Sequence, residues 1–150
     1  MTTDNPFAGL ALDTERAFKI LIMQPDGETP LRDEKNTQAW ATVVSGDSKI
    51  ASRARSEARA YVQELHDTNK MPEGIEADAL RSLVVASRCV TGWYLLSFNG
   101  KPVMDVDGTT PIPCTPDNAL KLFLMGDGVA WLYQQIVRPV YARENFTPAP

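Results

Sequence analysis

The sequence has little of what metal and redox sites are built from. Its 150 residues include two cysteines, Cys89 and Cys114, and one histidine, His66. A zinc site needs about four such ligands, and the cysteines form no C-x-x-C pair and have no histidine beside them. We therefore expect no metal site and no cofactor, and two reduced thiols are the simplest interpretation of the cysteines.

These three side chains have structural interpretations that outweigh catalytic ones. Cys89 lies on the apolar side of a predicted helix, where a thiol is buried and inert. Cys114 precedes a predicted helix start, where a thiolate can be stabilised, but no histidine lies near it in the sequence. His66 lies near a predicted helix end and complements the helix dipole there.

Three further features are missing: an excess of basic charge, a long apolar segment and a glycine-rich phosphate loop. The net charge is −4, which argues against a nucleic-acid binder. No segment approaches the roughly 18 apolar residues of a membrane span, and the N-terminus lacks the features of a signal peptide. No G-x-x-x-x-G-K-[ST] motif occurs. We expect a soluble protein that works inside a cell.

Hydrophobic periodicity predicts both strands and helices. Alternating side chains predict strands at residues 18–23 and 40–44, joined by a long polar loop or extended hairpin tip. A spacing close to 3.6 residues predicts helices at residues 50–65, 76–89 and 129–146, and a helix-start signal predicts a further short helix at 116–125. The fold class is therefore α+β, mostly helical, with a small antiparallel N-terminal hairpin or sheet.

Local signals mark the ends of these elements. Asp47 or Ser48 is the N-cap of the first helix, and Thr115 followed by Pro116 starts the third. Pro139 removes one backbone donor and is expected to kink or end the last helix.

The segment between the second and third helices contains a hairpin signal. Residues 93–98 are apolar enough for a strand or for the end of a buried helix. The Asn99-Gly100 pair predicts a tight turn, and residues 101–104 a returning strand that Pro102 restricts to a sheet edge.

The same signals divide the chain into three parts. Polar residues interrupted by proline and glycine predict a flexible N-terminal arm at 1–16. Residues 17–146 form a single domain, and residues 147–150 a disordered tail.

Asp105 and Asp107 invite a calcium or acid–base interpretation, which the spacing disfavours. Counted from Asp105, Thr110 takes the place of the glycine of an EF-hand loop and Pro116 that of its final glutamate. No base, nucleophile or metal partner can be named for the pair. A tight turn is the better interpretation, and we predict no catalytic residues.

Basic residues line one flank of the first predicted helix. Lys49, Arg53, Arg55 and Arg59 include like-charged pairs four residues apart, which are mildly destabilising. A solvated face is the simplest interpretation. A docking strip for an acidic partner is the main alternative, with Arg53 and Arg59 as candidate contacts, and nucleic acid is a lesser one.

Aromatic residues of the last helix are the other candidate contacts. Most aromatic side chains belong to the core, but aromatics are also preferred anchors of protein interfaces. The terminal helix presents four of them: Trp131, Tyr133, Tyr141 and Phe146.

Several short motifs between residues 17 and 146 resemble those of the tail assembly chaperones of long-tailed bacteriophages. They are a G-D-S helix start, a G-W step before a polar turn, a T-P-D-N helix entry and a closing N-F pair. The matching residues are Gly46, Asp47 and Ser48; Gly92 and Trp93; Thr115, Pro116, Asp117 and Asn118; and Asn145 and Phe146.

The resemblance implies a non-enzymatic assembly factor in the host cytoplasm. Such chaperones bind the tape-measure protein or another tail protein, keep its apolar helical surface from aggregating and give way to tail-tube subunits. Self-association along the client is also implied, whereas nucleic acid and membrane partners are not. The alternatives are a structural virion subunit, in the tail, the head–tail connector or the capsid decoration, and a host-directed inhibitor.

Overall fold

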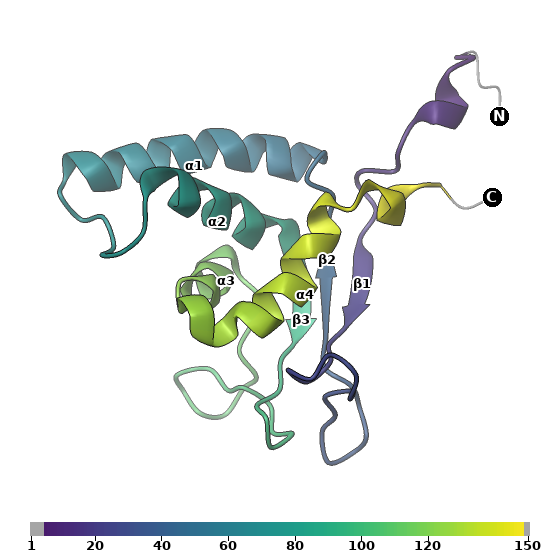
Figure 1. Cartoon of the computed structure of the whole chain (residues 1–150), viewed down its shortest axis with the longest axis vertical. Helices are drawn as coiled ribbons and strands as arrows, with labels where there is room; N and C mark the ends of the chain where they lie inside the picture. Colours follow the sequence, from purple (N-terminus) through teal and green to yellow (C-terminus); the bar gives the residue numbers. More distant parts are fainter. Residues whose placement is uncertain (1–4, 149–150) are drawn as a thin grey trace.

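The two strands expected near the N-terminus pair with each other and with a third strand from the middle of the chain. The computed structural model describes residues 5–148 (Figure 1). Strands β1 (Phe18–Leu21), β2 (Trp40–Val43) and β3 (Val90–Tyr94) form an antiparallel sheet in the order β1-β2-β3. The predicted α+β class, with a small antiparallel sheet built on the N-terminal hairpin, is confirmed.

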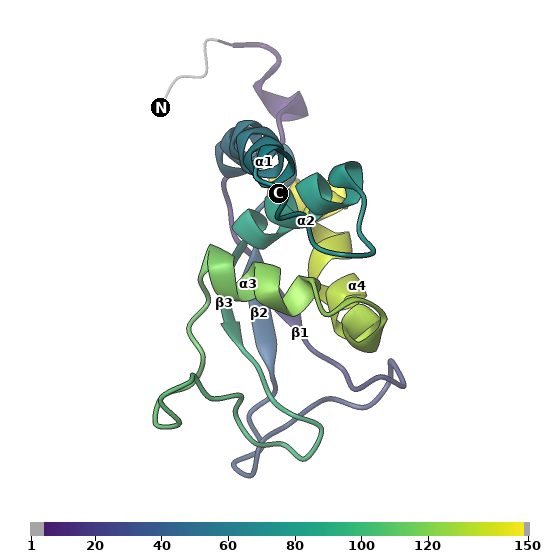
Figure 2. The same ribbon diagram turned by 90° about the vertical axis from the view of Figure 1, so that its left-hand side faces the viewer.

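The connection between β1 and β2 is an extended hairpin. Isolated bridges join Met23 to Pro30 and Arg32 to Gln38, so the chain stays paired well beyond the regular strands. Figures 1 and 2 show this connection beside the loop that follows β3, at the end of the sheet away from α1 and α2. The β1–β2 connection contacts the end of β3, where Tyr94 donates a hydrogen bond of 2.7 Å from its hydroxyl to Asp33.

Helices α1 (Lys49–Asp67) and α2 (Ala77–Cys89) form an antiparallel hairpin beside the sheet (Figure 1). Ser48 is the N-cap of α1, as one of the two predicted alternatives: its hydroxyl accepts a hydrogen bond of 3.1 Å from the Ala51 N–H. In the part of the chain that the structure describes, no helix is long and apolar enough to cross a bilayer.

The third strand begins earlier than the sequence indicated. β3 follows α2 directly at Val90 and ends at Tyr94, because its backbone pairs with β2 from Val90 onward. The turn at Asn99-Gly100 is confirmed, with Gly100 at a φ of 79°. The expected return strand at 101–104 is not regular: isolated bridges at Pro102 and Met104 are all that forms there, since proline has no N–H to donate.

Helices α3 (Pro116–Phe123) and α4 (Ala130–Tyr141) complete the domain. The N-cap of α3 is confirmed, since the Thr115 hydroxyl accepts a hydrogen bond from the Asn118 N–H at 3.1 Å. The prediction of one helix over 129–146 is wrong at its end. α4 stops two residues after Pro139, which lacks a backbone donor, and a 3-10 turn follows at Arg143–Phe146.

The core lies between the sheet and the helices. On β2, Ala41 and Val43 are buried in one cluster with Ile136 and Val140 of α4. Trp40 and Thr42 alternate with them and are only half-buried. The sheet therefore has one face covered by helices and one more open face, as its alternating pattern requires.

The two ends of the domain are joined. The backbone N–H of Asp13 donates to the carbonyl of Phe146 at 2.7 Å. The Arg16 guanidinium donates to the carbonyls of Asn145 and Thr147, at 2.8 and 3.1 Å. The expected N-terminal arm therefore does not extend to residue 16, because Asp13 and Arg16 are bonded to the C-terminal segment. Residues 1–4 and 149–150, in the predicted arm and tail, lie outside the described residues.

Candidate partner-binding groove

A groove lies between α1 and α2 and reaches the last residue of α4. It has a volume of about 470 Å³. Its walls come from three elements that are distant in sequence but adjacent in the fold. The lining residues are Arg55, Ala58 and Arg59 of α1; Asp78, Arg81, Ser82 and Val85 of α2; and Tyr141 of α4. We call this set the α1/α2 groove.

Small and apolar side chains form the floor of the α1/α2 groove. Ala58 and Val85 are buried, with exposures of 1% and 6%. Ala58 belongs to the row of alanines, with Ala51 and Ala54, that α1 turns toward the core. Because alanine extends so little from a helix, the backbones of α1 and α2 lie close together and the groove remains shallow.

Arginines form the rims of the groove. Arg81 of α2 is ion-paired with Asp78, one turn earlier on the same helix. Arg55 of α1 donates a hydrogen bond of 2.9 Å to the carbonyl of Gly46. Within residues 5–148, neither Arg55 nor Arg59 has a carboxylate partner. Both guanidinium groups on this rim therefore lack a directly paired carboxylate among the described residues, and Asp47 acts on Arg55 only from a longer distance.

Tyr141 closes one end of the groove with a ring that is open to solvent. The side chain is 55% exposed. Its ring lies against Gly46, where an added Cβ atom would come within 2.8 Å of two ring carbons. The backbone N–H of Gly46 also donates to the Val140 carbonyl at 2.8 Å. Glycine at position 46 thus lets the end of α4 and the start of α1 approach closely enough to place the ring there.

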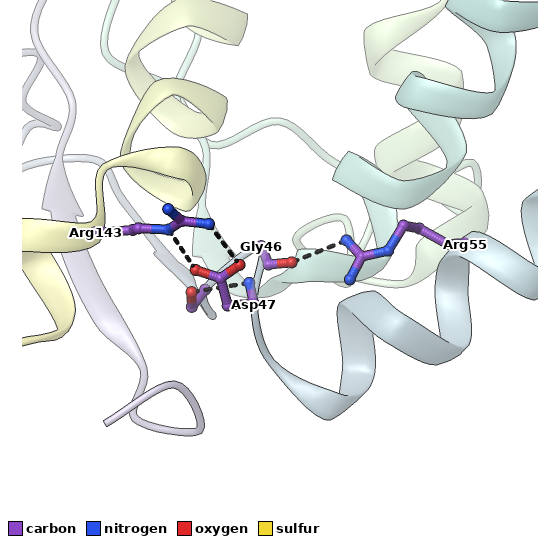
Figure 3. A network of polar contacts seen from close by, with 5 residues as sticks. Gly46, Asp47, Arg55 and Arg143 are labelled. Atoms are coloured by element: carbon purple, nitrogen blue, oxygen red, sulfur yellow. Dashed lines mark hydrogen bonds and ion pairs between the residues drawn. The ribbon is translucent and has the colours of Figure 1, made fainter. Parts of the chain in front are cut away.

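A polar network fixes that junction (Figure 3). Arg143 donates from Nε and Nη2 to the two carboxylate oxygens of Asp47, at 2.8 and 3.2 Å. Figure 3 shows Arg55 on the other side of Gly46, pointing at its carbonyl. The hydrogen bond from Arg143 holds the pKa of Asp47 below its usual value. The junction therefore carries an ionised carboxylate in a bidentate pair at neutral pH.

Two of the six predicted contact residues, Arg59 and Tyr141, line the α1/α2 groove together. Arg53 is exposed on α1 but does not line it. Tyr133 is half-buried, with its ring 5.1 Å from that of Phe123.

The expectation that Phe146 is presented to a partner is wrong. Phe146 has no exposed surface, and its ring meets that of Phe18 edge-on at 6.2 Å. The 3-10 turn after α4 directs this side chain inward, so the ring belongs to the core.

Trp131 lies at a second groove, of about 530 Å³, between α4 and the segment after β1. Its ring packs against Phe98 at 5.3 Å. Beside it, Gln135 accepts from the Met23 N–H at 2.7 Å and donates to the Met23 carbonyl at 3.0 Å. Gln135 therefore pairs with the backbone as a neighbouring strand would, and this amide serves the fold.

Sequence reasoning did not select Arg81 and Arg55, which line the groove, or Gly46, which supports the Tyr141 ring beside it. The position of Arg81 could have been predicted from the sequence, because helical spacing places Asp78, Arg81 and Ser82 on one face of α2. The contact between Gly46 and Tyr141 could not have been predicted from the sequence, since it depends on how α4 packs against the start of α1.

The groups considered for catalysis are engaged in the fold. Asp107 accepts hydrogen bonds from the N–H groups of Thr109 and Thr110 at 2.9 and 3.2 Å, and these bonds lower its pKa. Burial raises the pKa of Cys114 to about 11, and its thiol donates to the Val90 carbonyl at 3.6 Å. Cys89 is fully buried, as expected, and its pKa is likewise raised to about 11.

The remaining reactive candidates do not come together. His66 is exposed at the end of α1, 3.9 Å from Asp67. Within the described part of the chain, no three His, Cys, Asp or Glu side chains are grouped so that they could hold a metal ion.

The chain is thus an α+β fold with an open groove whose rims carry Arg55, Arg59 and Arg81. No protein-family model, no curated protein and no solved structure matches this chain. Several residues of the motifs that resemble those of the phage chaperones have structural roles in this fold. Ser48 and Thr115 cap helices, Trp93 donates from Nε1 to the Ile112 carbonyl at 2.9 Å, and Phe146 fills the core.

Proposed function

We propose that this protein is a non-enzymatic phage tail assembly chaperone that binds the tape-measure protein in the host cytoplasm during tail morphogenesis. One observation supports the proposal: the first motif of the resemblance contacts the segment that leads into its last motif, and this contact lies at the Tyr141 end of the α1/α2 groove. Gly46 of the G-D-S start lies under the Tyr141 ring. Asp47 accepts a hydrogen bond from Arg143, which lies two residues before the closing N-F pair.

The form of the groove suits a partner that must later be released. It is shallow, and its charges stand on the rim rather than in a closed cavity. Rim charges contribute mainly to the association rate and to specificity, and they are screened by salt. An assembly factor that gives way to tail-tube subunits needs binding of this reversible kind.

Co-expression with the tape-measure-like protein of the same genome tests the proposal. We expect the soluble yield of that protein to rise and the two chains to co-purify. An unchanged yield without co-purification contradicts the proposal. Mass spectrometry of purified particles tests the structural-subunit alternative, because a virion subunit is present in the mature particle and a chaperone is absent.

A further inference from the structure

We infer that the α1/α2 groove binds an acidic amphipathic helix of its protein partner. The apolar stripe of this helix contacts the exposed Tyr141 ring above the floor formed by Ala58 and Val85, and its carboxylates face Arg55 and Arg59. The inference rests on the proposed function in taking the partner to be a helical client.

The shape of the groove favours a helix as the occupant. Two antiparallel helices with small residues between them leave a channel into which a third helix packs by its side-chain ridges, roughly 8–10 Å from each axis. Ala58 of α1 and Ser82 of α2 have small side chains, so neither helix fills the channel. An amphipathic helix in such a channel contacts it through residues spaced three and four apart.

The charges favour acids on that helix. Arg55 and Arg59 are one turn apart on α1, and within the described residues neither has a carboxylate partner. Their mutual repulsion is mildly destabilising in the free protein. Carboxylates on a partner remove it, and guanidinium groups bind carboxylates in a bidentate manner.

Tyr141 supplies the anchor at the end of the channel. Exposed tyrosines beside arginines are typical of interface positions that contribute most to affinity. The ring is held against Gly46 before the partner arrives, so little side-chain entropy is lost on binding.

A protein helix suits these residues better than a nucleic acid. The chain has a net charge of −4, which repels a polyanion. Asp78 stands among the lining residues and is also unfavourable to phosphate. An amphipathic helix can place an apolar or basic residue next to Asp78, whereas a phosphate backbone cannot.

The binding test uses the full chain and a fluorescein-labelled helical peptide of about 20 residues. The peptide carries a leucine stripe flanked by glutamates, and binding is followed by fluorescence anisotropy. We expect saturable binding that weakens as salt rises from about 50 to 300 mM. A peptide with lysine in place of every glutamate is expected not to bind.

Two charge reversals on the same helix provide the decisive contrast. Arg59→Glu, in the groove, is expected to weaken binding about tenfold or more. Arg53→Glu makes the same change at an exposed position outside the groove and is expected to change affinity less than about twofold. Because Arg59 is exposed and has no ion-pair partner within residues 5–148, its reversal is not expected to unfold the protein, and circular dichroism checks this.

Tyr141→Ala is the second variant and is expected to weaken binding without altering the salt dependence. Equal losses from the Arg53 and Arg59 reversals overturn the inference, as does equal binding of the lysine peptide. Tighter binding of a 20-nucleotide single-stranded DNA than of the acidic peptide also overturns it, in favour of a nucleic-acid site.

The co-expression assay separates this inference from the proposed function. If wild type and Arg59→Glu raise the client yield equally, the chaperone function stands and the groove assignment fails. If wild type binds the acidic peptide through Arg59 but does not raise the client yield, the groove chemistry stands and the chaperone function fails.

Discussion

Two aromatic side chains of the C-terminal segment, five residues apart, have opposite environments. Phe146 has no exposed surface, whereas Tyr141 is 55% exposed. Phe146 belongs to a motif of the phage chaperone resemblance, and Tyr141 does not. The motif residue therefore supports the fold, and the residue outside the motif is the one available to a partner.

The backbone between the two residues explains the difference. α4 ends two residues after Pro139, and the chain continues into a 3-10 turn at Arg143–Phe146. Asp13 and Arg16 then bond to carbonyls of this segment, and Phe18 contacts the Phe146 ring. Tyr141 lies before this turn, as the last residue of α4, and remains exposed beside the groove.

The largest expected effect comes from removing the buried ring. Phe146→Ala leaves a cavity between β1 and the C-terminal turn and is expected to lower the free energy of unfolding by about 3–5 kcal/mol. Urea denaturation measures this loss. Phe98→Ala is the matched control, because Phe98 is 66% exposed and is expected to cost about 1 kcal/mol or less. Similar losses at the two positions would show that Phe146 is not a core residue.

The next effect concerns the motif at the start of α1. Ser48→Ala removes the hydroxyl that accepts from the Ala51 N–H and is expected to cost about 1 kcal/mol of stability. Ser52→Ala makes the same change at an exposed position inside α1, where alanine is favourable, and is expected to be neutral or slightly stabilising. Thermal unfolding of both variants checks the pair, and an unaffected Ser48→Ala protein would contradict the N-cap.

A smaller effect is expected at Gly46. Gly46→Ala pushes the Tyr141 ring away, because the new Cβ would stand 2.8 Å from its carbons. The exposed ring can swing outward, so we expect a loss of stability of about 1 kcal/mol or less together with weaker binding of the acidic peptide. NMR of the Tyr141 ring protons reports the movement. Gly128→Ala, where nothing lies within 4 Å of the new atom, is the control.

The smallest effect concerns the Asp47–Arg143 pair, which is exposed enough for solvent to screen it. The pKa of Asp47 is lowered in the folded state, mainly by the hydrogen bond from Arg143. A lowered carboxyl pKa stabilises the fold above the unfolded value of about 3.9, and this contribution is lost as the pH falls through the folded pKa. Asp47→Asn is therefore expected to be slightly less stable than wild type at pH 7.

Urea midpoints measured from pH 7 down to about pH 2.5 follow that contribution. The difference between wild type and Asp47→Asn is expected to close at the acid end. In an Arg143→Ala background, Asp47→Asn is expected to have little further effect. A difference that is constant with pH would contradict the pairing.

Local signals in the sequence were sufficient for much of the fold. The Ser48 and Thr115 caps and the Asn99-Gly100 turn depend on residues within a few positions, and they were predicted correctly. The prediction that Pro139 kinks or ends the last helix is confirmed, since α4 ends at Tyr141, whereas the continuation of that helix to residue 146 is wrong.

The groove was harder to predict because it depends on long-range packing. Phe146 stands among Arg143, Glu144 and Asn145, a context typical of an exposed aromatic, and its burial depends on Phe18 near the other end of the chain. Likewise, Arg53 and Arg59 are equivalent as sequence positions. Their difference appears only when α2 packs on one side of α1 and Tyr141 arrives from α4.

The central claim is that the partner occupies the α1/α2 groove beside Tyr141. Amide NMR shifts of the isotope-labelled protein, recorded as the client is added, test it most directly. We predict that the largest changes fall at residues 55–59 and 78–85 and at Tyr141, with residues 24–38 unaffected. Changes confined to residues 24–38 and 97–112, or to the surroundings of Trp131, would contradict the claim.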